Sequence, residues 1–467
     1  MNLHLVLLLA YSAVLIALGV GIGRRVGDVG TFFVAGRQLG PGLIFATVLA
    51  ANIGAGSTVG AASLGYRDGL SAWWWVGSAG IGTLLLAGWV GPRIWSIARQ
   101  HDLLTVGDFL EWRYGPEVRL VTTALLWVAT LMILAAQLVA VAFVLEAVAG
   151  VPAVAGCLIG GIVMTVYFAA GGLLTSAWVN LVQLLVLVAG FGIALPWALG
   201  DAGGWQAVVA AAPAGRPDYL SLWHGGRSGW HYAVLLVPAF IISPGLLQKV
   251  YGARDARAVR IGVGASGVAL LLFAAVPPLL GMLARVYDDT LIDAATNLAL
   301  PILLTVGLPV AVGSIGLAAV FSAEVSSADA ILFMLSTSLS KDLYRRFVNR
   351  AASDRQVLAV ARMGAVLGGA LGTALAIALG SVIESMTVFY SLLGVVLFVP
   401  VIGGLYVPRA GSREAMGAIV AGVVGYLGAR VLLPSQAGGL WNPNVLGLIG
   451  SALVFAVILA WRRAERV

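Results

Sequence analysis

The sequence has little charge, one cysteine and few histidines. Charged residues make up 10% of its 467 residues, and Cys157 alone excludes an internal disulfide. Four scattered histidines argue against a histidine-rich metal centre. Apolar residues are abundant instead, at 60% against roughly 45–50% in a soluble domain. The bilayer is the solvent that suits this composition, so we predict an all-α membrane protein.

Long apolar runs divide the chain into about 13 predicted transmembrane helices. Most are long enough to cross a hydrocarbon core of about 30 Å at about 1.5 Å per residue. Their approximate bounds are 3–23, 41–66, 71–97, 118–149, 151–170, 173–199, 230–252, 259–285, 309–340, 356–380, 382–406, 414–434 and 443–461. The loops between them are too short to form a soluble domain, so residues 1–467 are predicted to form a single transmembrane domain.

The placement of positive charge orients these segments. With the N-terminus outside, 22 of the 27 Lys and Arg residues fall on the cytoplasmic side. Because such residues favour that side, we expect an outer N-terminus and a cytoplasmic C-terminus in a cell inner (plasma) membrane. The net charge of +7 then reflects topology and does not indicate nucleic acid. Segment 3–23 is too long for a signal-peptide core, so it is expected to remain as an extra N-terminal helix.

Two segments contain residues that interrupt a helix. The second has glycines at Gly54 and Gly56, and the seventh contains Ser243-Pro244-Gly245. Gly and Pro break the helical hydrogen-bond ladder and free carbonyl groups. Each break opens a unit of five helices, 41–199 and 230–406, with two further helices at 414–461. Because five is odd, the second unit enters the membrane from the opposite side, and such inverted repeats are typical of secondary transporters.

Five motifs, in order and spacing, resemble the sodium:solute symporter family, whose fold is LeuT-type. They are Phe32-Phe33-Val34-Ala35-Gly36-Arg37; Leu49-Ala50-Ala51-Asn52-Ile53; Thr105-Val106-Gly107-Asp108-Phe109-Leu110 with Arg113-Tyr114-Gly115; Gly171-Gly172-Leu173 with Trp178 and Gln183; and Ser326-Ser327-Ala328-Asp329 with Lys341-Asp342-Leu343-Tyr344. The resemblance covers nearly the whole chain. It implies a sodium-coupled symporter, not an enzyme, that imports a small solute by alternating access.

The resemblance also implies a site for Na+, the expected coupling ion. Its carbonyl ligands would come from Ala50, Ile53 and Ala323, and its hydroxyl ligands from Ser326 and Ser327. Sodium prefers oxygen ligands, and a broken helix supplies free carbonyls. Independently, the spacing places Ala323, Ser326 and Ser327 on one stripe of a helix. The same serines would otherwise only bond back to their own helix.

Two carboxylates, Glu324 and Asp329, lie on the helix of these serines. An ionised group at the membrane centre costs at least about 2.5–3.5 kcal/mol, so neither is expected to face lipid. Some family members hold a second sodium with an Asp on the fifth core helix, where this chain has Asn180. A second ion site between Asn180 and Asp329 is one interpretation, its absence is another, and proton coupling through either carboxylate is a third. The sequence leaves the role of Glu324 open, and a paired structural residue near one membrane face is one further interpretation.

The family's fold places the solute beside the broken helices. The candidate contacts are Asn52, Gly54, Ser57, Thr58, Gln137, Phe240, Ser243, Phe389, Tyr390 and Ser391. Aromatic rings would stack on the solute and the few polar groups would orient it. Because charged candidates are few, we expect a neutral or zwitterionic organic solute, with the lipid bilayer as the other partner and a monomeric assembly.

Alternative functions remain open from the sequence alone. The run Trp73-Trp74-Trp75 together with the family's choline-transporting branch suggests a cationic cage, but consecutive tryptophans on a helix point in different directions, so an interfacial aromatic belt is the favoured interpretation. Asp288, Asp289 and Asp293 resemble the metal-binding aspartates of membrane-embedded prenyl transferases. The predicted topology places them in an outer loop, which disfavours that enzyme.

Overall fold

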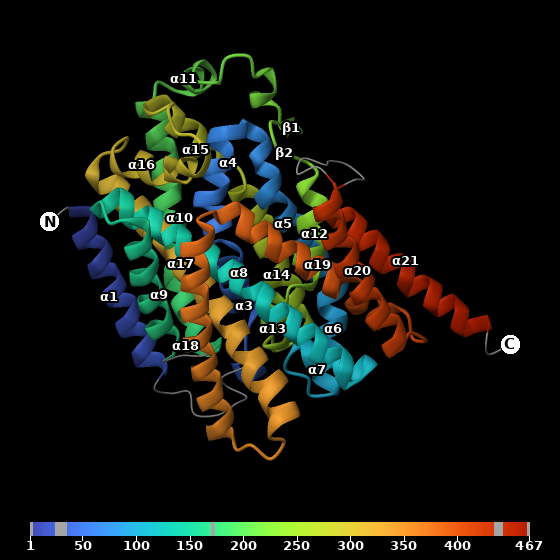
Figure 1. Cartoon of the computed structure of the whole chain (residues 1–467). Coiled ribbons are helices and arrows are strands. Elements are labelled where there is room, and N and C mark those ends of the chain that lie inside the picture. The colour runs from blue at the N-terminus through green and yellow to red at the C-terminus, as the bar shows by residue number, and fades with distance from the viewer. Residues whose placement is uncertain (1–2, 24–34, 170–172, 434–441, 465–467) are drawn as a thin grey trace.

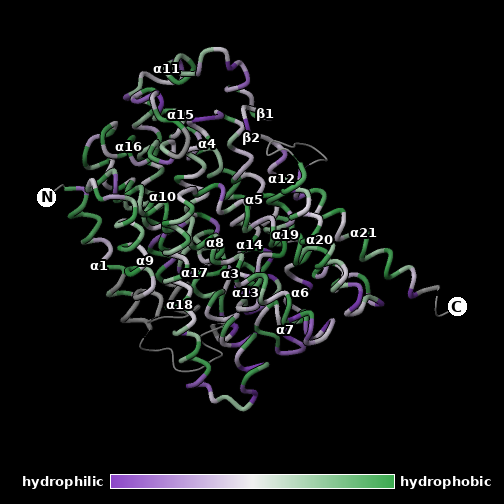
Figure 2. The backbone as a smooth tube through the Cα atoms, viewed as in Figure 1, coloured by the Kyte–Doolittle hydropathy of each residue, from purple (hydrophilic) through white to green (hydrophobic). Residues whose placement is uncertain are grey.

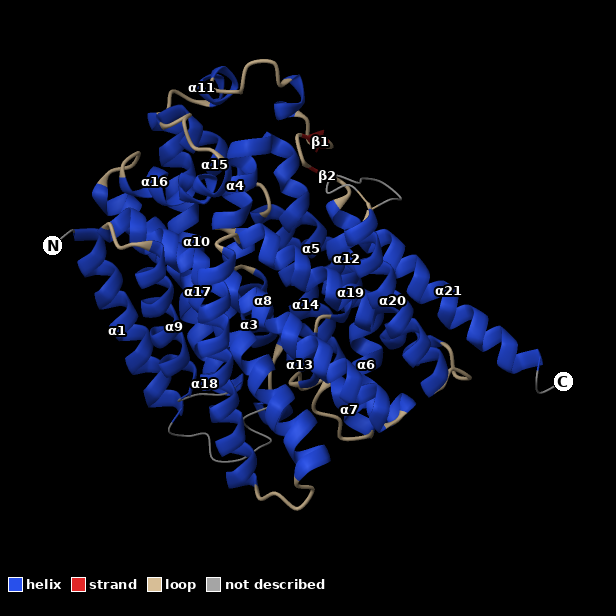
Figure 3. Ribbon diagram, in the orientation of Figure 1, coloured by secondary structure: helices blue, strands red, loops and turns tan. Residues whose placement is uncertain are grey.

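The computed structural model describes residues 3–23, 35–169, 173–433 and 442–464. The described chain is almost entirely helical, apart from a two-stranded hairpin (Figure 3). Several motif residues named above lie outside it: Phe32, Phe33, Val34, Gly171 and Gly172. The side chains of Trp178 and Asp293 are likewise not described.

The elements follow one another along the chain with short connections (Figure 1). The first part contains α1 Leu3–Gly23, η1 Ala35–Arg37, α3 Pro41–Asn52, η2 Ala55–Ser57, α4 Val59–Asp68, η3 Gly69–Ala72, α5 Trp73–Leu85, η4 Leu86–Val90, α6 Gly91–Gln100, α7 Val106–Tyr114, α8 Pro116–Ala149, α9 Ala153–Ala169 and α10 Leu173–Asp201. The second part contains α11 Trp205–Ala210, η5 Pro217–Leu220, β1 His224–Gly225, β2 Ser228–Gly229, α12 Tyr232–Ile242, α13 Pro244–Tyr251, α14 Ala256–Phe273, α15 Val276–Tyr287, η6 Asp293–Leu298, α16 Ala299–Thr305, α17 Val310–Thr337, η7 Ser338–Val348, α18 Asp354–Leu379, α19 Val382–Tyr406, α20 Ser412–Leu432 and α21 Pro443–Ala464.

Membrane spans account for most of this list. Within the described residues, ten helices are long and apolar enough to cross a membrane, and four apolar helices are shorter. The all-α membrane fold is therefore confirmed, whereas the count of 13 stays a prediction. Hydrophilic residues gather in the loops near α11 and in the connections beyond α7 and η7 (Figure 2). We call these two poles of the molecule the α11 end and the α7 end.

Both predicted helix breaks are present. The first separates α3 from α4, where Ile53 leaves helical geometry with φ −101° and ψ 106°. The second separates α12 from α13 at Ser243, whose ψ of 122° is extended. Pro244 explains this second break, because proline disfavours helical geometry in the residue before it and has no N–H to donate.

Helix α17 lies in the interior of the bundle. It packs against α10, α8, α18, α3 and α1, and every residue from Ala319 to Thr337 is buried. At one edge of the bundle, α20 and α21 form a pair that contacts the other helices mainly through α19 (Figure 1). The candidate site residues on α17 therefore face protein on all sides.

A short backbone bridge joins the two broken helices at the α7 end. The Leu39 N–H donates to the Gly252 carbonyl at 3.0 Å, and the Arg254 N–H donates to the Leu39 carbonyl at 3.0 Å. Leu39 lies two residues before the start of α3, and Gly252 immediately follows α13. The bridge thus ties the start of one broken helix to the end of the other.

Candidate functional site

The five predicted sodium ligands come together between α17 and the break in α3. The Ser326 hydroxyl lies 3.1 Å from the Ala50 carbonyl oxygen and 3.1 Å from the Ala323 carbonyl oxygen. The Ser327 hydroxyl lies 3.0 Å from the Ile53 carbonyl oxygen and 3.4 Å from that of Ala50. The result is a buried cluster of oxygen atoms contributed by two segments that are far apart in sequence.

The break explains why these carbonyls are free. In an unbroken helix the Gly54 N–H would donate to Ala50, but here it donates to the Ser57 hydroxyl at 3.2 Å. The Ser57 N–H likewise donates to the Gly54 carbonyl at 2.9 Å rather than to Ile53. Two backbone oxygens are thereby left for other partners, which is how broken membrane helices coordinate cations.

Glu324 pairs with the second half of the broken helix. The Thr58 hydroxyl lies 2.8 Å from Glu324 Oε1 and 3.0 Å from the Gly54 carbonyl oxygen, and both side chains are fully buried. Thr58 immediately precedes α4, so the contact connects α17 to the start of that helix. This arrangement matches the interpretation of Glu324 as a paired structural residue, and it directs Thr58 away from the solute position predicted for it.

Asp329 and Asn180 lie in the same buried region, on α17 and α10. The Lys249 ammonium is within electrostatic range of Asp329 and donates to the Gly245 carbonyl at 3.2 Å. The Asn180 amide donates to the Thr47 hydroxyl on α3 at 3.4 Å. A buried cation therefore already lies near Asp329, and a second ion site between Asn180 and Asp329 stays a prediction.

A cavity of about 50 Å³ adjoins the oxygen cluster. Most of the predicted solute contacts line it: Asn52, Gly54, Ser57, Gln137, Phe240, Ser243, Phe389 and Tyr390. Thr58 and Ser391 do not line it, and the Ser391 hydroxyl instead donates to the Thr387 carbonyl at 2.6 Å. Ser327 lines the cavity as well as the oxygen cluster, so the two candidate sites share a side chain. We call this space the central cavity.

The polar groups of the central cavity are held by the broken helix. Gln137 on α8 accepts a hydrogen bond of 2.9 Å from the Ala55 N–H, which the break leaves without a helical partner. The Asn52 amide donates to Thr83 on α5 at 3.3 Å. These bonds fix the side chains that would orient a solute.

Aromatic rings close the central cavity toward the α11 end. Phe240 and Tyr390 lie with ring centroids 5.2 Å apart, and Trp75 is 6.3 Å from Tyr390. Trp75 also lines a small adjoining cavity of about 10 Å³ together with Met386. Sequence reasoning missed Trp75 because three consecutive tryptophans do not reveal which of them points inward, and Met386 gave no signal.

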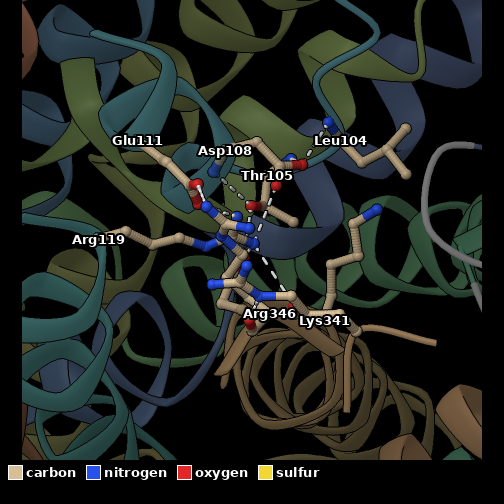
Figure 4. A network of polar contacts seen from close by, with 9 residues as sticks. Leu104, Thr105, Asp108, Glu111, Arg119, Lys341 and Arg346 are labelled. Carbon is tan, nitrogen blue, oxygen red and sulfur yellow. Dashed lines mark hydrogen bonds and ion pairs between the residues drawn. The ribbon is translucent and has the colours of Figure 1, made fainter. Parts of the chain in front are cut away.

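A network of ion pairs lies at the α7 end (Figure 4). Arg119 contacts Glu111 at 2.7 Å, Asp108 at 2.9 Å and Asp342 at 2.5 Å. Arg346 contacts Glu111 as well. The network joins α7, α8 and η7. Sequence analysis named Asp108 and Asp342 only as residues of two family motifs and did not predict that they share a partner.

Comparisons with known proteins agree with this architecture. The model of the sodium:solute symporter family matches residues 32–425. The chain is 30% identical to the sodium/pantothenate symporter of Escherichia coli over 98% of this chain and 96% of that protein. It is 24% identical to the sodium/glucose cotransporter of Vibrio parahaemolyticus over 88% of this chain and 82% of that protein.

A solved structure extends the agreement to the fold. A sodium-coupled sialic acid symporter in a substrate-bound, outward-open state superimposes with a TM-score of 0.83 at 18% identity, over 98% of this chain and 97% of that one. This likeness supports the LeuT-type arrangement expected from the sequence. The broken helices, the match over residues 32–425 and the full-length relative together show that the chain belongs to the sodium:solute symporter family.

Proposed function

We propose that the chain is a sodium-coupled symporter that imports a small neutral or zwitterionic organic solute by alternating access. The observation that carries the proposal is the convergence of the Ser326 and Ser327 hydroxyls on the carbonyls of Ala50 and Ile53. With Ala323, these atoms offer a hard cation only oxygen, as sodium requires. In the proposal a sodium ion replaces the hydrogen bonds that now join the two helices.

Coupling between ion and solute follows from shared groups. Ser327 contacts the Ile53 carbonyl and also lines the central cavity. Gln137 lines the same cavity and holds the Ala55 N–H, two residues beyond Ile53. A sodium ion that orders the break therefore also orders the groups that would bind solute, which raises the affinity for solute by linkage.

The lining of the central cavity supports the class of solute. Among the described residues that line it, none carries a charged side chain. An ionic solute would lose its hydration there without a compensating partner, which is unfavourable. Amide and hydroxyl groups beside aromatic rings suit a solute that forms hydrogen bonds and has an apolar face.

Orientation in the membrane is part of the proposal. The α7 end carries most of the arginines of the connecting loops and is taken as cytoplasmic. Import is then driven by the inward sodium gradient of a plasma membrane. Two further features remain part of the proposal: a second ion site between Asn180 and Asp329, and the inverted repeats at 41–199 and 230–406.

Thermal stability of the purified protein tests the proposal. A ligand that binds only the folded state stabilises it by RT ln(1 + [L]/Kd), so the melting temperature rises with the concentration of ligand. We expect pantothenate, glucose, proline or choline to raise it in sodium chloride and not in potassium chloride. Choline as the only active solute would favour cation uptake instead.

Two serine variants localise the ion. Ser327→Ala should lose most of the sodium response, whereas Ser336→Ala should keep it. Ser336 is a buried serine of the same helix that bonds only its own backbone, to Leu332 at 2.6 Å. A wild-type sodium response in Ser327→Ala would show that the ion site lies elsewhere.

A further inference from the structure

A second cavity, of about 30 Å³, lies between the central cavity and the α7 end. Met334 on α17 and Phe389 on α19 line both cavities, so they form the partition between them. The remaining wall comes from the start of α7, from α8, α13 and η7. We call this space the inner cavity.

Oxygen atoms are concentrated on the wall of the inner cavity. Its polar lining residues are Thr105, Thr122, Thr123, Thr130, Gln248, Thr337, Ser338 and Asp342. Thr122 and Gln248 are each only 3% exposed. Among the described residues the Thr122 hydroxyl and the Gln248 amide oxygen have no hydrogen-bond partner. Buried polar atoms without partners are unfavourable. The lone pairs of these two oxygen atoms would be satisfied by a bound cation or a hydrogen-bond donor.

The adjacent ion-pair network gives this wall a negative charge. It contains three carboxylates, those of Asp108, Glu111 and Asp342, but two guanidinium groups. Lys341 joins it only through its carbonyl oxygen, which accepts from Arg119 at 3.5 Å. Asp342, which also accepts a 2.7 Å bond from Thr105, is the carboxylate of this network that lines the inner cavity.

The size of the inner cavity limits what it can hold. A water molecule needs roughly 10–15 Å³ of such volume. A space of about 30 Å³ therefore holds two or three water-sized species. A small cation with one or two waters fits both the volume and the oxygen-rich, negatively charged wall.

We propose that the inner cavity is a second binding site for a monovalent cation, where sodium is held after it leaves the oxygen cluster at Ser326 and Ser327. Thr122 and Gln248 supply oxygen ligands, and Asp342 supplies the attracting charge. The proposal rests on the sodium coupling proposed above. It assigns the site to α8, α13 and η7, on the far side of Met334 from the Ser327 cluster.

The test separates the two sites by disabling the first. The purified Ser326→Ala/Ser327→Ala variant is titrated with sodium chloride while N-methylglucamine chloride keeps ionic strength constant. We expect a weak, sodium-specific rise in melting temperature to remain. Adding Thr122→Val or Gln248→Met should raise the sodium concentration needed for this residual response about tenfold, because each change removes one oxygen that would contact a charged ligand.

The matched control is Thr373→Val, since Thr373 is also a buried threonine but lies on α18 and bonds to the Gly369 carbonyl at 2.7 Å. It should leave the residual response unchanged. The inner site is refuted if no residual response exists, or if Thr122→Val behaves like Thr373→Val. Melting temperatures in the absence of sodium report whether each variant folds. If Gln248→Met does not fold, Thr122→Val alone decides the test.

Failure of the proposed function looks different. In that case the wild-type protein shows no sodium response, or the double serine variant retains the whole of it. A response that survives the serine changes and is lost in Thr122→Val would leave the inner site as the principal ion site.

Discussion

The Ser327 hydroxyl lies 3.0 Å from the Ile53 carbonyl oxygen, although 274 positions separate the two residues in sequence. Ile53 can offer this oxygen because Ser57, its normal helical partner, donates to Gly54 instead. The contact therefore exists only while the break in α3 and the serine stripe of α17 face each other. A movement of either helix relative to the other would separate these oxygen atoms.

Replacing Gly54 should damage this contact without adding charge. A Cβ at Gly54 would overlap the Ser327 side chain and lie 2.9 Å from Gln137 Oε1. We expect Gly54→Ala to abolish the sodium-dependent rise in melting temperature and sodium-driven uptake. Gly42→Ala in α3, the helix before the break, is the control, because a Cβ there meets nothing within 4 Å. Sodium binding of wild-type strength in Gly54→Ala would contradict the geometry of the break.

Arg119 should matter for stability more than a loop arginine would. It is buried and contacts three carboxylates, so Arg119→Gln leaves their charges without a buried partner. Breaking such a pair from one side costs about 3–5 kcal/mol. Arg254→Gln removes an exposed pair with Asp255 and should change stability by only about 0–1 kcal/mol. Urea titration in detergent measures both, and equal losses would argue against the buried network.

Phe240 should affect the solute and not the ion. Its ring lines the central cavity and lies against Tyr390, away from the serine cluster. Phe240→Ala should weaken the response to the solute identified in the panel by about tenfold while leaving the response to sodium alone in place. Phe191→Ala, a buried ring that packs on Phe273 outside the cavity, serves as the control. Equal effects of the two variants would remove Phe240 from the solute site.

Thr58 distinguishes a solute contact from a structural one. Its hydroxyl bonds to Glu324, so Thr58→Val leaves a fully buried carboxyl oxygen unsatisfied at a cost of about 1–3 kcal/mol. Solute affinity should remain near the wild-type value, because Thr58 does not line the central cavity. A stable Thr58→Val protein with lost solute affinity would restore the role that sequence reasoning gave this residue.

Much of the fold was predictable because membrane helices are specified locally. Long apolar runs locate the spans, and Gly54 and Pro244 mark both breaks by their own backbone properties. The serine stripe could be predicted for the same reason, since Ser326 and Ser327 are neighbours on one helix. Which segment faces that stripe came from the family resemblance and not from spacing.

Tertiary position accounts for what sequence reasoning missed. Trp75 and its neighbour Trp74 have the same side chain, and only tertiary packing buries Trp75 against Tyr232 on α12 and Tyr390 on α19. Arg119 looks like any loop arginine until α7 and η7 surround it. Thr122 and Gln248 become noteworthy only together, on the wall of one cavity.

The bridge through Leu39 has a mechanical consequence. Because its two hydrogen bonds tie the start of α3 to the end of α13, the two broken helices share a hinge point at the α7 end. A tilt of one broken helix alone at this end would have to break these two bonds, whereas a tilt of both together could keep them.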